Sequence, residues 1–188
     1  MKLRTKSERD EILEAIFALY PTKTIELDFE TPFQLLTAVM LSAQMTDKGV
    51  NKATKKLFEI VKTPADLLKL EPEKVEVMLR GVNYYRVKTK HLFQTAVKLV
   101  HEHGGKIPQT LETIRTLPGV GVKTAKVVLS HLYDMPFIGV DTHIHRVMNR
   151  MGIVKTKTPE ETDKKLEKLL SEDQKRTMHH AIVLFGRY

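Results

Sequence analysis

The sequence predicts an all-α fold, and three observations support that prediction. Apolar residues recur along most of the chain at the three- and four-residue spacing of amphipathic helices. Thr31-Pro32 and Thr63-Pro64 have the pattern of a helix cap followed by the first helical residue. No segment has a strong strand signal, and the weak alternation over residues 24–29 is interpreted as an extended connector.

We expect about ten helices, with each start and stop argued from local signals. Ser7 is a candidate cap for the first helix, and Pro21 follows its end. The segment 32–45 is apolar on nearly every side, which is typical of a helix at the centre of an all-α core. Gly104-Gly105 ends a long amphipathic helix. After the first helix, the predicted helices are 32–45, 47–61, short helices from Pro64 and Pro72, 86–103, 108–117, 122–133, 142–151, 160–170 and 172–185.

Composition excludes several classes of protein. The chain has 188 residues and no cysteine, which excludes a disulfide framework, thiolate metal sites and a cysteine nucleophile. The longest nearly apolar stretch, 35–43, is far shorter than the roughly 20 residues that cross a bilayer. The N-terminus is charged where a signal peptide is apolar, so we expect a cytoplasmic protein with no membrane partner. The net charge of +8 favours a polyanionic partner, with nucleic acid first.

The segment Leu117-Pro118-Gly119-Val120-Gly121 lies between two predicted helices. Glycines allow positive φ and close approach of another backbone. The first N–H groups of the next helix have no partner inside it and carry the positive end of the helix dipole. The residues therefore predict a phosphate-binding loop. A plain turn between two helices is the alternative.

Lys123 and Asp141 form a candidate catalytic pair. Lys123 begins the helix after the glycines, where the dipole disfavours a positive charge on the amine. A neutral lysine can form a Schiff base with a carbonyl-level carbon, and a carboxylate can take its proton. The alternatives are a solvated surface lysine and an aspartate that caps the next helix.

Five segments, in order, together resemble the endonuclease III family of helix-hairpin-helix DNA glycosylases. The resemblance covers nearly the whole chain and implies two helical domains, 22–134 and 1–21 with 135–188, with the lesion pocket between them. The segments are Leu41-Ser-Ala-Gln-Met-Thr-Asp47, Val50-Asn-Lys-Ala53, Leu117-Pro-Gly-Val-Gly-Val-Lys-Thr-Ala125, Val140-Asp-Thr-His-Ile-His-Arg-Val147 and His179-His-Ala-Ile-Val-Leu-Phe-Gly-Arg-Tyr188.

The resemblance also implies an activity. Lys123 would attack C1′ of a damaged nucleotide and expel the base, with help from Asp141. The resulting imine would then undergo β-elimination and nick the strand. The expected substrates are oxidised pyrimidines of the thymine glycol type and abasic sites in double-stranded DNA. We expect the protein to act as a monomer on the DNA of the nucleoid.

The resemblance also implies that other residues contact the DNA. Gln44 would fill the space of the flipped base, and Val82 would wedge into the base stack. The family usually has Leu at the position of Val82, and Asn83-Tyr84-Tyr85-Arg86 also departs from it. The remaining expected DNA or lesion contacts are Asp47, Leu117, Gly119, Val120, Gly121 and His143. The structural alternatives to these DNA contacts are a polar residue at a helix end for Gln44, an apolar loop residue for Val82 and a helix cap for Asp47.

The chain also departs from the family in its cofactor. Most members carry a four-cysteine loop with a [4Fe–4S] cluster after the segment that matches Gly186-Arg187-Tyr188. Met148 and Met178 stand where members often have cysteine. We therefore expect no cluster and no catalytic metal. A naturally clusterless member is favoured, and a shortened form without cysteine is the alternative. A structural alkali ion held by carbonyls of the hairpin is expected by analogy.

Basic residues suggest where phosphates bind. They are Lys48, Lys52, Arg86, Lys88, Lys90, Lys123, Lys126 and Arg146, and a solvated face is the alternative. Two rival functions stay open. One is a monofunctional mismatch glycosylase, whose family members typically lack the lysine. The other is a DNA-binding protein without catalysis.

Overall fold

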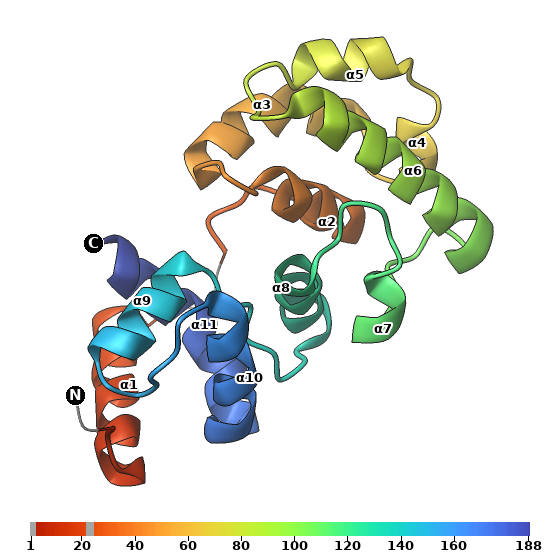
Figure 1. Cartoon of the computed structure of the whole chain (residues 1–188). Coiled ribbons are helices and arrows are strands. Elements are labelled where there is room, and N and C mark those ends of the chain that lie inside the picture. Colours follow the sequence, from red (N-terminus) through yellow and green to blue (C-terminus); the bar gives the residue numbers. More distant parts are fainter. Residues whose placement is uncertain (1–2, 22–24) are drawn as a thin grey trace. The chain divides into compact units, whose positions relative to one another are not determined.

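The computed structural model describes residues 3–21 and 25–188 (Figure 1). All regular secondary structure in these residues is helical, so the predicted all-α class is confirmed. The chain divides into two compact units, Met1–Ile25 with Tyr133–Tyr188, and Glu26–Leu132. The helices are α1 (Lys6–Leu19), α2 (Pro32–Leu41), α3 (Asp47–Ile60), α4 (Pro64–Leu67), α5 (Pro72–Met78), α6 (Tyr85–His103), α7 (Leu111–Ile114), α8 (Val122–Tyr133), α9 (Thr142–Arg150), α10 (Pro159–Leu169) and α11 (Glu172–Arg187).

The boundaries differ from the predictions in three places. Thr5, not Ser7, caps α1, because its hydroxyl accepts from the Glu8 N–H in a capping box. The predicted helix 32–45 ends at Leu41, and the predicted helix 108–117 is only the single turn of α7. Residues 22–24 of the predicted connector lie outside the described residues, and 25–29 contain no helix or strand.

Helix α2 is the centre of the Glu26–Leu132 unit (Figure 1). Every residue from Phe33 to Leu41 is buried, as expected for a helix that is apolar on all sides. The buried Gln34 amide donates to the carbonyls of Phe58 (2.9 Å) and Val61 (2.8 Å), which ties α2 to the end of α3. Helix α2 also packs on α6, which in turn packs on α4 and α5.

The other unit has its own apolar core. Helix α11 packs against α9 and α1, and α10 packs against α9. Ile144, Met148 and Ile182, all 0% exposed, lie in this core. None of the described helices has the length and apolar character needed to span a membrane.

Candidate nucleic-acid interface

Helices α7 and α8 and the loop between them form a helical hairpin held by α6. The Thr95 hydroxyl of α6 donates to the Pro118 carbonyl at 2.9 Å. The Lys98 amine, one turn further along, donates to the Thr116 carbonyl at 3.2 Å. The hairpin loop, residues 117–121, is therefore positioned by side chains from a long helix, which makes it a rigid platform.

The two hairpin glycines have different roles. Gly119 has φ of +78°, and a Cβ there would lie 3.0 Å from the His91 Cβ and 3.1 Å from the Met40 Cε. Gly121 does not have positive φ, and a Cβ there would meet nothing within 4 Å. The first glycine thus allows the turn and its close packing, while the second leaves open space where another backbone can approach.

Leu117 and Val120 do not present their side chains to solvent. Leu117 is 2% exposed and Val120 is 7% exposed. The Val120 N–H donates to the Leu117 carbonyl at 3.1 Å and closes the turn. Both side chains therefore anchor the loop, so any DNA contact here comes from the backbone.

Lys123 is exposed in the first turn of α8, next to the hairpin loop. One turn later Lys126 is 4% exposed, so its expected place on a phosphate-binding face is wrong. Residues 125–129 are all buried, because α8 is enclosed on most sides at this point. The lysine in the first turn of α8 is thus exposed, whereas the lysine one turn later is buried.

Gln44 lies in the α2–α3 loop, which two side chains from elsewhere hold in place. Gln44 is exposed and has φ of +59°. Its carbonyl accepts from the Asn83 amide at 2.7 Å. The Lys88 amine donates to the carbonyls of Leu41 and Ala43, both at 2.7 Å, and so caps the end of α2. Burial lowers the pKa of the Lys88 amine.

Asp47 begins α3 but does not cap it. The cap is Thr46, whose hydroxyl accepts from the Gly49 N–H at 3.2 Å. Asp47 is half-buried in the first turn. The carboxylate therefore lies at the positive end of the helix dipole, three residues after Gln44.

Val82 differs most from its expected role. Its side chain is 2% exposed, so the structure does not present it as a wedge. The exposed apolar side chain of the same α5–α6 loop is Tyr84, at 68%. The sequence pattern could not separate these two residues, because a short loop has no periodicity to reveal which side chain faces inward.

Asp141 is the N-cap of α9, and its Oδ1 accepts from the Ile144 N–H at 2.9 Å. His143, in the first turn, lies 3.2 Å from the Gly186 carbonyl through its Nδ1. Arg146 donates to that same carbonyl, so both side chains contact the end of α11. Asp141 and Lys123 belong to different units, and their pairing stays a prediction.

The residues present do not fit a thiolate-held cluster. The 188 residues contain no cysteine. Met148 (0% exposed) and Met178 (4% exposed), at two positions where the family often has cysteine, pack in the apolar core of their unit. Among the described residues, no group of three or more His, Asp or Glu side chains is arranged to hold a metal ion.

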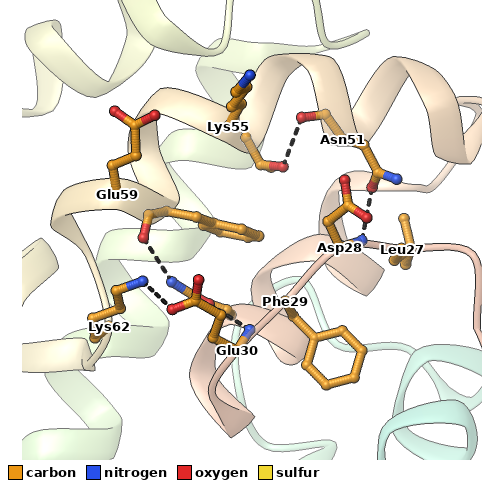
Figure 2. Close-up of a pocket in the computed structure, with 11 residues that line it drawn as sticks. Leu27, Asp28, Phe29, Glu30, Asn51, Lys55, Glu59 and Lys62 are labelled. Atoms are coloured by element: carbon orange, nitrogen blue, oxygen red, sulfur yellow. Dashed lines mark hydrogen bonds and ion pairs between the residues drawn. The ribbon is translucent and has the colours of Figure 1, made fainter.

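A pocket of about 610 Å³ lies away from all of these residues. Segment 27–30 lines it together with residues of α2 and α3 (Figure 2). Glu30 and Lys62 form an ion pair at one side of it, and the side-chain Oδ1 of Asn51 accepts from the Asp28 N–H at 2.9 Å on the other. Two of its charged groups, Glu30 and Lys62, thus neutralise each other, and no predicted site residue is among those that line the pocket.

Comparison with known proteins identifies the family. Residues 37–172 match the model of the HhH-GPD superfamily base excision DNA repair proteins. Endonuclease III of Escherichia coli K12 is 42% identical over 183 residues, 97% of this chain and 87% of that protein. The chain belongs to the endonuclease III family of HhH-GPD base excision DNA repair proteins. Endonuclease III of Thermotoga maritima is 40% identical over 178 residues, 95% of this chain and 82% of that protein.

Solved structures of the endonuclease III family agree with this assignment. A trapped endonuclease III–DNA covalent intermediate, an estranged-adenine complex, matches with a TM-score of 0.93 and 37% identity. The match covers 99% of this chain and 88% of that one. As a member of the endonuclease III family, the chain is a base excision repair enzyme, a DNA glycosylase and abasic-site lyase.

Proposed function

We propose that this enzyme removes oxidised pyrimidines of the thymine glycol type and then nicks the strand at the abasic site, with Lys123 as nucleophile. The observation that carries the proposal is the exposed position of Lys123 in the first turn of α8, directly after the hairpin loop that α6 holds. A relative that is 37% identical has been trapped in a covalent complex with DNA, which supports a covalent mechanism here.

In the proposed first step, the neutral Lys123 amine attacks C1′ of the flipped nucleotide. The N-glycosidic bond breaks, and its electron pair leaves with the base, which is protonated as it departs. Asp141 takes the proton that the amine loses and stabilises the positive charge that develops on the sugar. Opening of the sugar ring then gives a protonated imine between Lys123 and C1′.

The imine makes the strand cleavage possible. It acidifies the hydrogen on C2′, and removal of that proton breaks the C3′–O bond by β-elimination. The phosphate leaves with the electron pair, and the strand is nicked 3′ to the lesion. Water then hydrolyses the imine and releases the Lys123 amine. Both strand cleavage and base removal thus depend on one lysine.

Asp141 suits the role of proton acceptor because a hydrogen bond fixes the position of its side chain. The cap hydrogen bond to the Ile144 N–H fixes the carboxylate at the start of α9. The ionised carboxylate is the form that accepts a proton. Cap and proton acceptor are therefore compatible roles for one residue.

We propose double-stranded DNA with a damaged base or abasic site as the partner. The N–H groups of the hairpin loop and the first turn of α8 would bind a phosphate, with Gly119 shaping the turn and Gly121 leaving room for the strand. Backbone groups of Leu117 and Val120 would take part, since their side chains are buried. Gln44 would fill the space of the flipped base, with Asp47 and His143 near the lesion.

The remaining expectations complete the proposal. The enzyme would act as a monomer on nucleoid DNA in the cytoplasm, without an iron–sulfur cluster. Its functional domains would be 22–134 and the combination of 1–21 with 135–188. An alkali ion held by hairpin carbonyls would add to phosphate binding.

A labelled duplex with a single thymine glycol tests the proposal. The wild type is expected to nick the strand without alkali. Lys123→Gln is expected to give no nick even after hot alkali, because base removal also needs the amine. The matched control is Lys69→Gln, which removes an exposed lysine of the same unit that has no proposed DNA contact, and it should keep both activities.

Three results would contradict the proposal. Base release by Lys123→Gln would show that another group expels the base. A wild type that nicks only after alkali would be a monofunctional glycosylase. Binding of the duplex without base release would indicate a DNA-binding protein that has lost its chemistry.

A further inference from the structure

Tyr84 is an exposed aromatic side chain on an unusual backbone. It is 68% exposed and has φ of +58°, a left-handed conformation that few residues other than glycine adopt. It precedes α6 at the N-cap position, where its side chain makes no capping hydrogen bond. Residues in such conformations are concentrated at sites that bind or react. Neither burial nor capping explains this tyrosine.

The backbone around Tyr84 is firmly held. The Asn83 amide donates to the Gln44 carbonyl at 2.7 Å, and the Asn83 N–H contacts the Met45 sulfur at 3.4 Å. The Val82 side chain is buried beneath, and its carbonyl accepts from the Tyr85 N–H at 3.1 Å. The ring is therefore presented from a rigid support, so little ordering entropy opposes its use in binding.

Tyr84 also lies near the other proposed DNA contacts of its unit. The preceding residue, Asn83, makes the hydrogen bond to the loop that carries Gln44. His91, which packs against Gly119 of the hairpin, follows seven residues later on α6, a rise of about 10 Å. Arg86 and Lys90, both exposed, lie on the helix between them. Because seven residues make about two helical turns, Tyr84 and His91 lie toward the same side of α6, which joins the aromatic ring to the hairpin.

We propose that Tyr84 stacks on a DNA base beside the extruded nucleotide, taking the part that the family pattern gives to Val82. Extrusion leaves the neighbouring bases with an uncovered face, and an aromatic ring covers such a face whatever the base. Val82 is too deeply buried to reach it in this structure. The inference rests on the proposed function for the identity of the partner, but it concerns binding and not the lysine chemistry.

The chain has no tryptophan, so Tyr84→Trp introduces a single fluorescent reporter. The probe is a duplex with one tetrahydrofuran site, an abasic analogue that lysine cannot open. Stacking is expected to quench the tryptophan when this duplex binds. The matched control is Tyr188→Trp, which carries the reporter at another exposed tyrosine, 86% exposed, and should show no comparable quenching.

Affinity provides the second readout. Tyr84→Ala is expected to weaken binding of the tetrahydrofuran duplex by about tenfold, as loss of one base–aromatic stack does, while Tyr84→Phe binds like wild type. Leu19→Ala, at an exposed residue of α1, controls for surface truncation. The Tyr84 variants should fold, because the side chain packs against little.

Unchanged affinity for Tyr84→Ala together with an unquenched Tyr84→Trp would overturn the inference. Weaker binding by Val82→Ala, with an unchanged melting temperature, would overturn it in favour of Val82 after a loop movement. Neither result depends on catalysis, because the analogue does not react. Failure of the lysine chemistry would appear separately, in the thymine glycol assay.

Discussion

Gly119 is the residue where the hairpin depends most directly on the absence of a side chain. Its φ of +78° and the 3.0 Å approach of a Cβ to His91 both oppose substitution. We expect Gly119→Ala to lower the free energy of unfolding by at least about 1–2 kcal/mol, the cost of a left-handed non-glycine residue. Urea denaturation measures the change.

Gly121 provides the matched comparison two residues later. Nothing lies within 4 Å of a Cβ there, so Gly121→Ala should change stability by less than about 0.5 kcal/mol. It should instead weaken duplex binding, since the methyl group would occupy space left for the phosphodiester strand. Normal DNA binding by Gly121→Ala would contradict the phosphate-binding role of the loop.

Asp141 has a structural role and a proposed chemical role, and two substitutions separate them. Asp141→Asn retains a good N-cap and should fold with wild-type stability. Asp141→Ala should lose about 1 kcal/mol of stability. Both variants should lose most base-release activity, measured on thymine glycol duplex, because neither side chain accepts the proton. Full activity of Asp141→Asn would remove the carboxylate from the mechanism.

The sequence predicted some of these residues better than others. The hairpin glycines were expected only to permit positive φ, and Gly119 adopts it while Gly121 does not. The cap at Asp141 follows from local chemistry and is confirmed. The burial of Val82 and Lys126 depends on tertiary packing, which no local pattern records. Lys126 is a basic residue on an amphipathic-looking helix, but residues 125–129 of α8 are all buried.

At the scale of elements, the end of α2 depends on a side chain from α6. Lys88 donates to two α2–α3 carbonyls at 2.7 Å, which would otherwise lack partners at the helix end. We expect Lys88→Met to lower the free energy of unfolding by about 0.5–1.5 kcal/mol, the net contribution of an intramolecular hydrogen bond. Binding of an abasic duplex should also weaken, because the loop that carries Gln44 is no longer held.

Lys90→Met is the control for this prediction. Lys90 is exposed two residues further along α6. Its loss should leave the unfolding free energy unchanged within about 0.5 kcal/mol. Equal destabilisation by the two substitutions would show that the Lys88 hydrogen bonds do not support the loop.

Most helices could be predicted from their periodicity and caps, but their ends were harder. Thr-Pro pairs at Thr31 and Thr63 marked the starts of α2 and α4 correctly. The predicted end of α2 was wrong: α2 ends at Leu41, whose carbonyl accepts from the Lys88 amine, and Gln44 has a positive φ that a helix does not allow. Such a long-range cap has no signal in the local sequence.

At the scale of the whole molecule, the charge of +8 predicts salt-dependent DNA binding. The logarithm of the binding constant should fall linearly with the logarithm of salt concentration. Lys90→Gln should lower that slope by about 1 if the lysine contacts a phosphate. Lys69→Gln should not, since Lys69 is paired with Asp66 at 3.0 Å on α4. Equal effects would indicate a diffuse charge rather than a defined face.

The family could be predicted from the sequence because its motifs are long and occur in a fixed order. The all-α class and the family are confirmed. The pairing of Lys123 with Asp141 and the range of lesions stay predictions. They depend on how DNA and the two units come together, which local sequence patterns do not encode.

Borohydride trapping on an abasic-site duplex tests the central claim most directly. The reductant converts an imine into a stable amine, so wild type should form a covalent complex with DNA, and peptide mapping should locate the bond at Lys123. Lys123→Ala should bind the duplex but form no complex, while Lys69→Gln should trap like wild type. A complex formed by Lys123→Ala, or mapped to another residue, would contradict the account.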